Sequence, residues 1–278
     1  MKNNFDTSAE NAEKLREMSK RMRKMALDMA LASGNYGSHL GSSLSAIEIM
    51  AVLYGAVLNF DDFDNRDIFI PSKNHCVLAH IPALAESGFI SREEILEFQK
   101  DGGRLTGYPM RPEIGLEYSG GTLGMAISVG IGLALAAKGK NSAREIFILL
   151  GDGELQEGSN WEAFMSAAHF KLDNVTAIID RNFLSLDGET EKIMSLENLS
   201  DKLKSFNWQV TECDGHNTQE LLQAFEKKYV EKPRAIIAKT VKGKGVSFIE
   251  NKAEYHHHTL SQKDYEVAVA EVLGGELK

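Results

Sequence analysis

Glu145-Ile-Phe-Ile-Leu-Leu150 and Val175-Thr-Ala-Ile-Ile-Asp180 are short runs of large aliphatic and β-branched residues. Such runs are typical of strands that are buried on both faces of a sheet. Two further runs have the same character, Trp208-Gln-Val-Thr-Glu212 and Arg234-Ala-Ile-Ile-Ala-Lys-Thr240. Because helical patterns alternate with these strands, the sequence predicts βαβ units. We therefore expect an α/β fold, a doubly wound and mostly parallel sheet with helices on both faces.

The remaining segments predict helices. Thr7 or Ser8 can cap a first helix, in which Leu15 and the methionines from Met18 to Met29 recur at helical spacing and indicate packing in the core or between subunits. A glycine- and serine-rich stretch at 33–45 interrupts the pattern. Further helices are expected near 46–58, 74–87, 91–100 and 123–138, from 157 onward, and at 261–273. The chain has no repeat and no evident linker, so residues 1–278 are expected to form a single domain with a C-terminal helical tail.

Composition and charge exclude several classes of protein. Of 278 residues, 43% are hydrophobic and 26% are charged, as in ordinary soluble globular proteins. The net charge of −9 argues against a nucleic-acid partner. Cys76 and Cys213 lie far apart and fit a reducing compartment. The polar N-terminus lacks the apolar core of a signal peptide, and the longest apolar run, 125–137, is too short to span a bilayer. We expect a soluble cytoplasmic protein without a membrane partner.

An acidic turn follows the first of the quoted strands. Gly151-Asp152-Gly153 comes directly after that strand, and Asn182 follows the next one, 30 positions beyond Asp152. One helix and one strand fill the interval, so both side chains are expected at the carboxyl edge of the sheet, where parallel α/β folds bind ligands. A carboxylate, an amide oxygen and a nearby backbone carbonyl suit Mg²⁺. The alternative is structural, an Asx-type turn at Asp152 and a turn asparagine at Asn182.

This region resembles the thiamine-diphosphate motif of transketolases. The resemblance rests on Gly151-Asp-Gly-Glu-Leu-Gln-Glu-Gly158, Trp161-Glu-Ala163 and the pattern Asp180-x-Asn-x-Leu-Ser-Leu-Asp-Gly188. Other segments are similar to transketolase segments in the same order: 38–45, 71–75, 121–124, 239–245 and 254–256. The chain ends where full-length transketolases continue, so it resembles the separate N-terminal subunit of a split enzyme.

The resemblance implies a cofactor, thiamine diphosphate, and a metal ion, Mg²⁺ with Ca²⁺ or Mn²⁺ as substitutes. The metal would be bound by Asp152, Asn182 and the carbonyl of Leu184. The amide of Gly153 and the side chains of His75 and His256 would contact the diphosphate. The remaining implied cofactor contacts are Gly121 and Leu123 at the aminopyrimidine and His39 near the reacting carbon.

The catalytic residues that the resemblance implies are His39, His75, Tyr108 and Glu157, with Glu157 and Glu162 at a subunit contact. Tyr108 departs from the family pattern, because transketolases usually have a histidine there that faces the terminal hydroxyl of the donor. Deoxyxylulose-phosphate synthases, which use pyruvate, typically have phenylalanine at the similar position. Further departures are Leu40 for proline, Asn74 for glycine and Met125-Ala126 for Gln-Gly.

Several other polar residues allow more than one interpretation. The run His256-His257-His258 could bind a transition metal, although adjacent side chains point in different directions. Lys242 and Lys244 alternate with Gly243 and Gly245 and face either the diphosphate or solvent. The remaining histidines are expected to be structural: His80, His169 and His216.

The resemblance implies a transferase that moves a two-carbon ketol unit from a ketose to an aldehyde acceptor. Its partner would be a C-terminal transketolase-like subunit that supplies the pyrimidine domain and its glutamate, in an α2β2 heterotetramer. The small-molecule substrate would be a sugar phosphate or a 2-oxo acid. The first alternative is decarboxylative acyloin synthesis from pyruvate or another 2-oxo acid. Two others are the α subunit of a 2-oxo acid dehydrogenase and a non-catalytic regulatory subunit.

Overall fold

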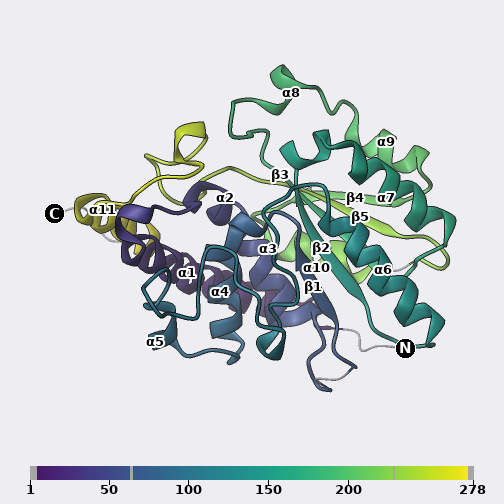
Figure 1. Ribbon diagram of the computed structural model, residues 1–278, viewed down its shortest axis with the longest axis horizontal. Coiled ribbons are helices and arrows are strands. Elements are labelled where there is room, and N and C mark those ends of the chain that lie inside the picture. The colour runs from purple at the N-terminus through teal and green to yellow at the C-terminus, as the bar shows by residue number, and fades with distance from the viewer. Residues whose placement is uncertain (1–4, 63–64, 228, 275–278) are drawn as a thin grey trace.

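The computed structural model describes residues 5–62, 65–227 and 229–274 (Figure 1). Five strands form a sheet in the order β1-β2-β3-β5-β4, and each neighbouring pair is parallel. The strands are β1 (Ile68–Pro71), β2 (Ile146–Gly151), β3 (Val175–Arg181), β4 (Gln209–Asp214) and β5 (Arg234–Lys239). The expected α/β fold is confirmed, and the described pairings are parallel throughout.

Helices cover both faces of the sheet, as Figure 1 shows. Along β2, Phe147 and Leu149 pack on one side with residues of α1 (Ala9–Ala32), α3 (Ile47–Val52), α4 (Val77–Glu86) and α10 (Thr218–Glu226). Ile146, Ile148 and Leu150 pack on the other side with α6 (Ala126–Gly139), α7 (Gly158–His169) and α9 (Leu199–Ser205). Successive strand residues point to opposite faces, so an uninterrupted apolar run is what a doubly covered strand requires.

Strand β1 was not predicted. Its residues are buried, and it pairs with β2 from Ile68 opposite Ile146 to Pro71 opposite Leu149. Proline lacks a backbone donor, which suits the end of a strand at the edge of the sheet. A run of four residues is too short to distinguish a strand from other buried segments by its pattern.

The first helix begins and packs as predicted. Ser8 is its N-cap, and the Ser8 hydroxyl accepts a hydrogen bond from the amide of Asn11 at 3.2 Å. The methionines from Met18 to Met29 are buried within the core of this chain. Their packing is therefore internal, and this stripe is not available as a contact surface between subunits.

Several helix boundaries differ from the expected ones. The stretch at 33–45 contains a short helix, α2 (Leu40–Leu44), and the helix expected near 46–58 changes after α3 into a π-helical turn, Leu53–Val57. The helix expected near 74–87 begins as a 3-10 turn, and that near 91–100 shortens to α5 (Arg92–Ile95). Gln99 has a φ of 55°, which an α-helix does not accommodate. The remaining helices are α8 (Thr190–Ile193) and α11 (Gln262–Leu273).

The register of the sheet brings the ends of its strands together. Gly151 at the end of β2 lies opposite Asp180 of β3, and Arg181 lies opposite Lys239 at the end of β5. The turns that follow these strands therefore meet at one edge, the carboxyl edge. Within the described ranges, no helix has both the length and the apolar character needed to cross a membrane.

Candidate active site

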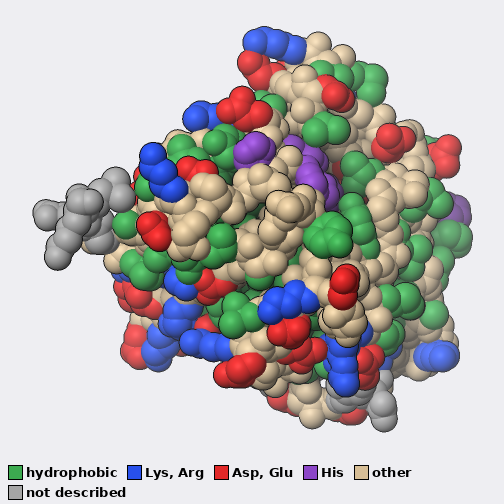
Figure 2. All heavy atoms as spheres, turned by 60° about the vertical axis from the view of Figure 1, so that its left-hand side comes forward, with side chains coloured by type: hydrophobic (Ala, Val, Ile, Leu, Met, Phe, Trp, Pro, Cys, Tyr) green, Lys and Arg blue, Asp and Glu red, His purple; other side chains and the backbone are tan. Residues whose placement is uncertain are grey.

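A cavity of about 330 Å³ opens at the carboxyl edge of the sheet. It is lined by residues that follow β1, β2, β3 and β5, together with α2 and the loop before α6. Figure 2 shows histidine side chains gathered in one place on this side of the molecule, with hydrophobic side chains beside them. The structure brings together ten of the residues that the sequence singled out: His39, His75, Tyr108, Gly121, Leu123, Asp152, Gly153, Asn182, Leu184 and His256.

Asp152 and Asn182 lie side by side on the turns after β2 and β3. One carboxylate oxygen of Asp152 accepts a hydrogen bond from the amide of Gly153 at 2.8 Å, and the other accepts one from the amide of Phe183 at 2.5 Å. Burial raises the pKa of Asp152 to about 6, and the charge of Asp180 adds to this effect. The amide oxygen of Asn182 accepts a hydrogen bond from the amide of Leu184 at 3.1 Å. Asp152, Asn182 and Leu184 line the same cavity, so a carboxylate, a side-chain amide and a backbone carbonyl are available there as hard-oxygen donors.

Three histidines from distant segments meet in the cavity. The ring centroids of His39, His75 and His256 lie 5.2 to 5.4 Å apart. Burial lowers the pKa of His39 to about 4 and that of His256 to about 3, and it also lowers the pKa of His75. Neighbouring positive groups act in the same direction in all three cases. At neutral pH the cluster therefore consists of uncharged imidazoles, each able to donate and to accept a hydrogen bond.

The sequence left open whether Lys242 and Lys244 face the cavity or solvent, and the structure gives a different answer for each. Lys242 is 1% exposed, and its ammonium lies 3.3 Å from the carbonyl of Leu184 and 2.9 Å from Nδ1 of His256. Burial, reinforced by the charge of Lys73, lowers the pKa of Lys242 to about 8. Lys244 is not among the residues that line the cavity; its side chain is 40% exposed and its ammonium lies 3.7 Å from the carboxylate of Glu250. Lys242 therefore faces the cavity, and Lys244 belongs to a solvated turn.

A buried ion pair at the wall of the cavity was not predicted from the sequence. The ammonium of Lys73 contacts the carboxylate of Asp180, which also accepts hydrogen bonds from the hydroxyls of Ser45 and Thr240. The side chains of Lys73 and Asp180 are 1% and 0% exposed. Removing either one would leave an uncompensated buried charge, which is strongly destabilising. Asp180 ends the apolar run 175–180, and Lys73 lies in the segment 71–75. A charged residue at the end of a buried strand was the one signal in the sequence that could have indicated this pair.

Glu154 was also missed, although it connects three parts of the site. Its carboxylate accepts hydrogen bonds from the amide of Gly124 at 2.9 Å and from the amide of Gly151 at 3.1 Å, and it contacts the hydroxyl of Ser72. Gly124 has a φ of 83°, and a Cβ there would lie 2.8 Å from the Cβ of Glu157. Glycine is therefore required at this turn.

Some expected residues lie outside the cavity. Glu157 is the exposed N-cap of α7, and Glu162 is exposed on the first turns of the same helix. The helical turn that lines the cavity is the preceding 3-10 segment, Gly153–Gln156, rather than the start of α7. The rim of the cavity is apolar and open: Tyr108, Leu123, Leu186 and Ile193 are 43%, 36%, 61% and 45% exposed.

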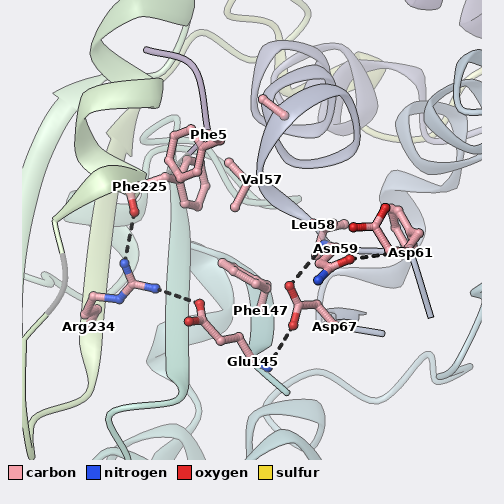
Figure 3. A pocket seen from close by; sticks show the side chains of 12 residues that line it. Phe5, Val57, Leu58, Asn59, Asp61, Asp67, Glu145, Phe147, Phe225 and Arg234 are labelled. Carbon is pink, nitrogen blue, oxygen red and sulfur yellow. Dashed lines mark hydrogen bonds and ion pairs between the residues drawn. The ribbon is translucent and has the colours of Figure 1, made fainter. Parts of the chain in front are cut away.

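A second cavity, of about 220 Å³, lies at the opposite, amino edge of the sheet (Figure 3). There Asp67 accepts hydrogen bonds from the amides of Asn59 and Glu145 at 3.1 and 2.9 Å. Arg234 donates to the carbonyls of Phe225 and Lys227 at 3.0 and 2.8 Å. Arg234 also lies 3.4 Å from the carboxylate of Glu145. These charged groups bind the backbone and each other and so join elements of the fold, and the candidate active site is therefore the cavity at the carboxyl edge.

Comparison with known proteins identifies a family. Residues 15–275 match the family model described as transketolase, thiamine diphosphate binding domain. The chain is 38% identical over 264 residues to one subunit of an apulose-4-phosphate transketolase from Actinobacillus succinogenes, covering 92% of this chain and 96% of that one. It is 37% identical to a 6-deoxy-6-sulfo-D-fructose transketolase subunit of a Clostridium species, covering 90% and 93%.

Among solved structures, the transketolase of Campylobacter jejuni superposes with a TM-score of 0.86 at 28% sequence identity. The match covers 95% of this chain and 43% of that one, so the chain spans about two fifths of the length of that transketolase.

Proposed function

This chain belongs to the transketolase family, and we propose that it is the thiamine-diphosphate-binding subunit of a two-subunit transketolase. The enzyme transfers a two-carbon ketol unit from a ketose donor to an aldehyde acceptor. The observation that carries this proposal is the single cavity in which the oxygen donors of Asp152 and Asn182 meet the histidine cluster and Lys242.

The donor set at the strand ends fits a magnesium ion bound to a diphosphate. The carboxylate of Asp152, the amide oxygen of Asn182 and the carbonyl of Leu184 would bind Mg²⁺, with Ca²⁺ or Mn²⁺ as substitutes. Lys242 donates a hydrogen bond to that carbonyl, so it would turn toward the phosphate oxygens when a metal takes its place. A cation and neutral imidazole donors next to the metal ligands form an environment that favours an anion.

The other residues of the cavity would orient the cofactor. We assign the diphosphate to the amide of Gly153 and the side chains of His75 and His256, and the aminopyrimidine to the turn of Gly121 and Leu123. When bound there, thiamine diphosphate would supply the nucleophilic carbon that the ketol transfer requires. His39, uncharged at neutral pH, would exchange a proton with the oxygen of the reacting carbonyl.

The partner subunit is the second part of the proposal. Its support is that both relatives compared above are named as subunits, and that the rim residues Tyr108, Leu123, Leu186 and Ile193 expose apolar surface around the cavity. The partner would supply the pyrimidine-side domain with its glutamate, in an α2β2 heterotetramer. Glu157 and Glu162, both exposed at the start of α7, would lie at a subunit contact. We treat residues 1–278 as one domain of a cytoplasmic enzyme.

The donor is proposed to be a modified ketose, such as a modified sugar phosphate. The two relatives act, by their names, on apulose 4-phosphate and on 6-deoxy-6-sulfo-D-fructose. Tyr108, at the rim, replaces the histidine expected to face the donor hydroxyl and gives the site a bulkier wall. The same tyrosine supports a second candidate, acyloin formation from pyruvate or another 2-oxo acid.

The test is an assay of the chain with and without its partner. We expect the isolated chain to bind thiamine diphosphate without turnover, and the complex to transfer a ketol unit from ketose phosphates. Full activity of the isolated chain would refute the two-subunit proposal, and preference of the complex for pyruvate over ketose phosphates would favour the second candidate.

A further inference from the structure

Three ionisable side chains from distant segments meet beside the cavity, outside its lining. They are Arg23 of α1, Glu48 of α3 and His216 of the turn between β4 and α10. The carboxylate of Glu48 lies 2.7 Å from the guanidinium of Arg23 and 2.9 Å from Nδ1 of His216. Burial would raise the pKa of Glu48, but Arg23 and the hydrogen bond of His216 hold it below its usual value. We call these residues the Glu48 cluster.

Two further side-chain groups of the Glu48 cluster form hydrogen bonds with the backbone of residues 241–244. The Nε of Arg23 donates to the carbonyl of Lys244 at 2.9 Å. The Nε2 of His216 accepts a hydrogen bond from the amide of Val241 at 2.8 Å, so the ring proton is on Nδ1 and is donated to Glu48. The two contacts bracket Lys242, the lysine whose ammonium enters the cavity.

Packing also fixes this segment from both sides. Gly245 has a φ of 90°, and a Cβ there would lie 2.8 Å from the Cδ of Arg23. The amide of Gly243 donates to the carbonyl of Gly41 at 2.8 Å. The backbone on either side of Lys242 is therefore held by two hydrogen bonds from the Glu48 cluster and by one from the backbone to Gly41.

A buried ionic cluster of this kind is weak evidence for stability, because apolar residues of similar volume often stabilise as well. What distinguishes this cluster is that its outer groups bind specific backbone atoms: Arg23 donates to the carbonyl of Lys244, and His216 accepts from the amide of Val241. We propose that Arg23, Glu48 and His216 are positioning residues that hold Lys242 in place to bind the diphosphate of the cofactor. The inference rests on the proposed function, since it takes Lys242 to contact that diphosphate.

Two amide substitutions of His216 separate positioning from stability. In His216→Asn the side-chain amide nitrogen replaces Nδ1 and can still donate to Glu48, but the acceptor for Val241 is lost. In His216→Gln the amide oxygen replaces Nε2 and can still accept from Val241, but the contact with Glu48 is lost. Both variants remove one buried hydrogen bond, so a purely structural role predicts similar effects of the two on all properties.

The affinity of the full chain for thiamine diphosphate is measured by calorimetric titration in the presence of Mg²⁺, alongside thermal unfolding. We expect His216→Asn to weaken binding roughly fivefold and His216→Gln to bind nearly as wild type, since one lost hydrogen bond is worth about 1 kcal/mol. In a Lys242→Met background, His216→Asn should weaken binding no further, because it acts through the lysine. Equal losses in the two variants, or losses that add to that of Lys242→Met, would overturn the inference.

The same titrations distinguish this inference from the proposed function. If Lys242→Met binds thiamine diphosphate as tightly as wild type, the assignment of Lys242 is wrong and the inference falls with it. If Lys242→Met is weakened while His216→Asn is not, the inference is wrong and the proposed function stands.

Discussion

The carboxyl and amino edges of the sheet both carry buried charged side chains, but these side chains have different partners. At the amino edge, Asp67 and Arg234 bind backbone amides and carbonyls of neighbouring elements. At the carboxyl edge, Asp152 and Lys242 converge with three histidines on one cavity. Burial of charge therefore does not identify a functional site. The informative difference is the chemistry that shares the cavity, since at the carboxyl edge a carboxylate, an amide side chain and a lysine line one cavity together with three imidazoles.

The largest effect is expected from Asp152→Ala at the carboxyl edge. Loss of a metal-binding carboxylate should weaken thiamine diphosphate binding at least about 100-fold, since even indirect partners of metal ligands are worth 10- to 100-fold. Far-ultraviolet circular dichroism should show an unchanged fold. Calorimetric titration with thiamine diphosphate and Mg²⁺ is the measurement, and wild-type affinity in the variant would remove Asp152 from the site.

The matched change at the amino edge is Asp67→Ala. Asp67 is 4% exposed, and its loss leaves the amides of Asn59 and Glu145 without their acceptor. We expect the free energy of unfolding to fall by about 3 kcal/mol, with the affinity of the folded chain for thiamine diphosphate unchanged. Denaturant unfolding and titration below the unfolding transition check both parts. If the variant were as stable as wild type but no longer bound thiamine diphosphate, Asp67 would have a role in cofactor binding rather than in stability, contrary to this prediction.

A smaller effect is expected from Lys242→Met, with Lys244→Met as its control. Methionine keeps the length of the side chain and removes the charge, so loss of a charged contact to diphosphate should weaken binding roughly tenfold. Lys244, two positions away, points to the surface, and its replacement should change binding less than twofold. Equal effects of the two lysines would indicate a general charge effect rather than a contact in the cavity.

The smallest effect, and the one that concerns the substrate, is expected from Tyr108→His. A hydroxyl-pairing histidine should raise kcat/KM for an ordinary ketose phosphate relative to the preferred donor by a few-fold, because a paired hydroxyl favours donors that carry it. Binding of the cofactor should stay as in wild type, since Tyr108 lies at the rim. Unchanged donor preference would show that Tyr108 already makes this contact with its own hydroxyl.

The sequence predicted those elements whose pattern of apolar residues lies within one continuous stretch of the chain. Strands β2 and β3 were predicted because long apolar runs are what doubly covered strands require, and their spacing predicted that Asp152 and Asn182 would meet. Strand β1 and the partners of Lys73 and Glu154 were not predicted. Lys73 pairs with Asp180, 107 positions away, and Glu154 bonds to Ser72, 82 positions away. Such pairings depend on how the elements pack, which the pattern of one sequence does not contain.

The carboxylate of Glu154 also has a consequence for the energetics of ligand binding. Because it holds Gly124 and Gly151 together, the turn assigned to the aminopyrimidine becomes ordered when the chain folds. Ordering one residue reduces the conformational entropy by an amount equivalent to about 1–2 kcal/mol. Because this turn is ordered on folding, the loss enters the free energy of folding and not the free energy of cofactor binding. A preorganised turn gains affinity without any additional contact to the ligand. Variants that loosen it would bind more slowly and less tightly even with every cofactor-contacting side chain in place.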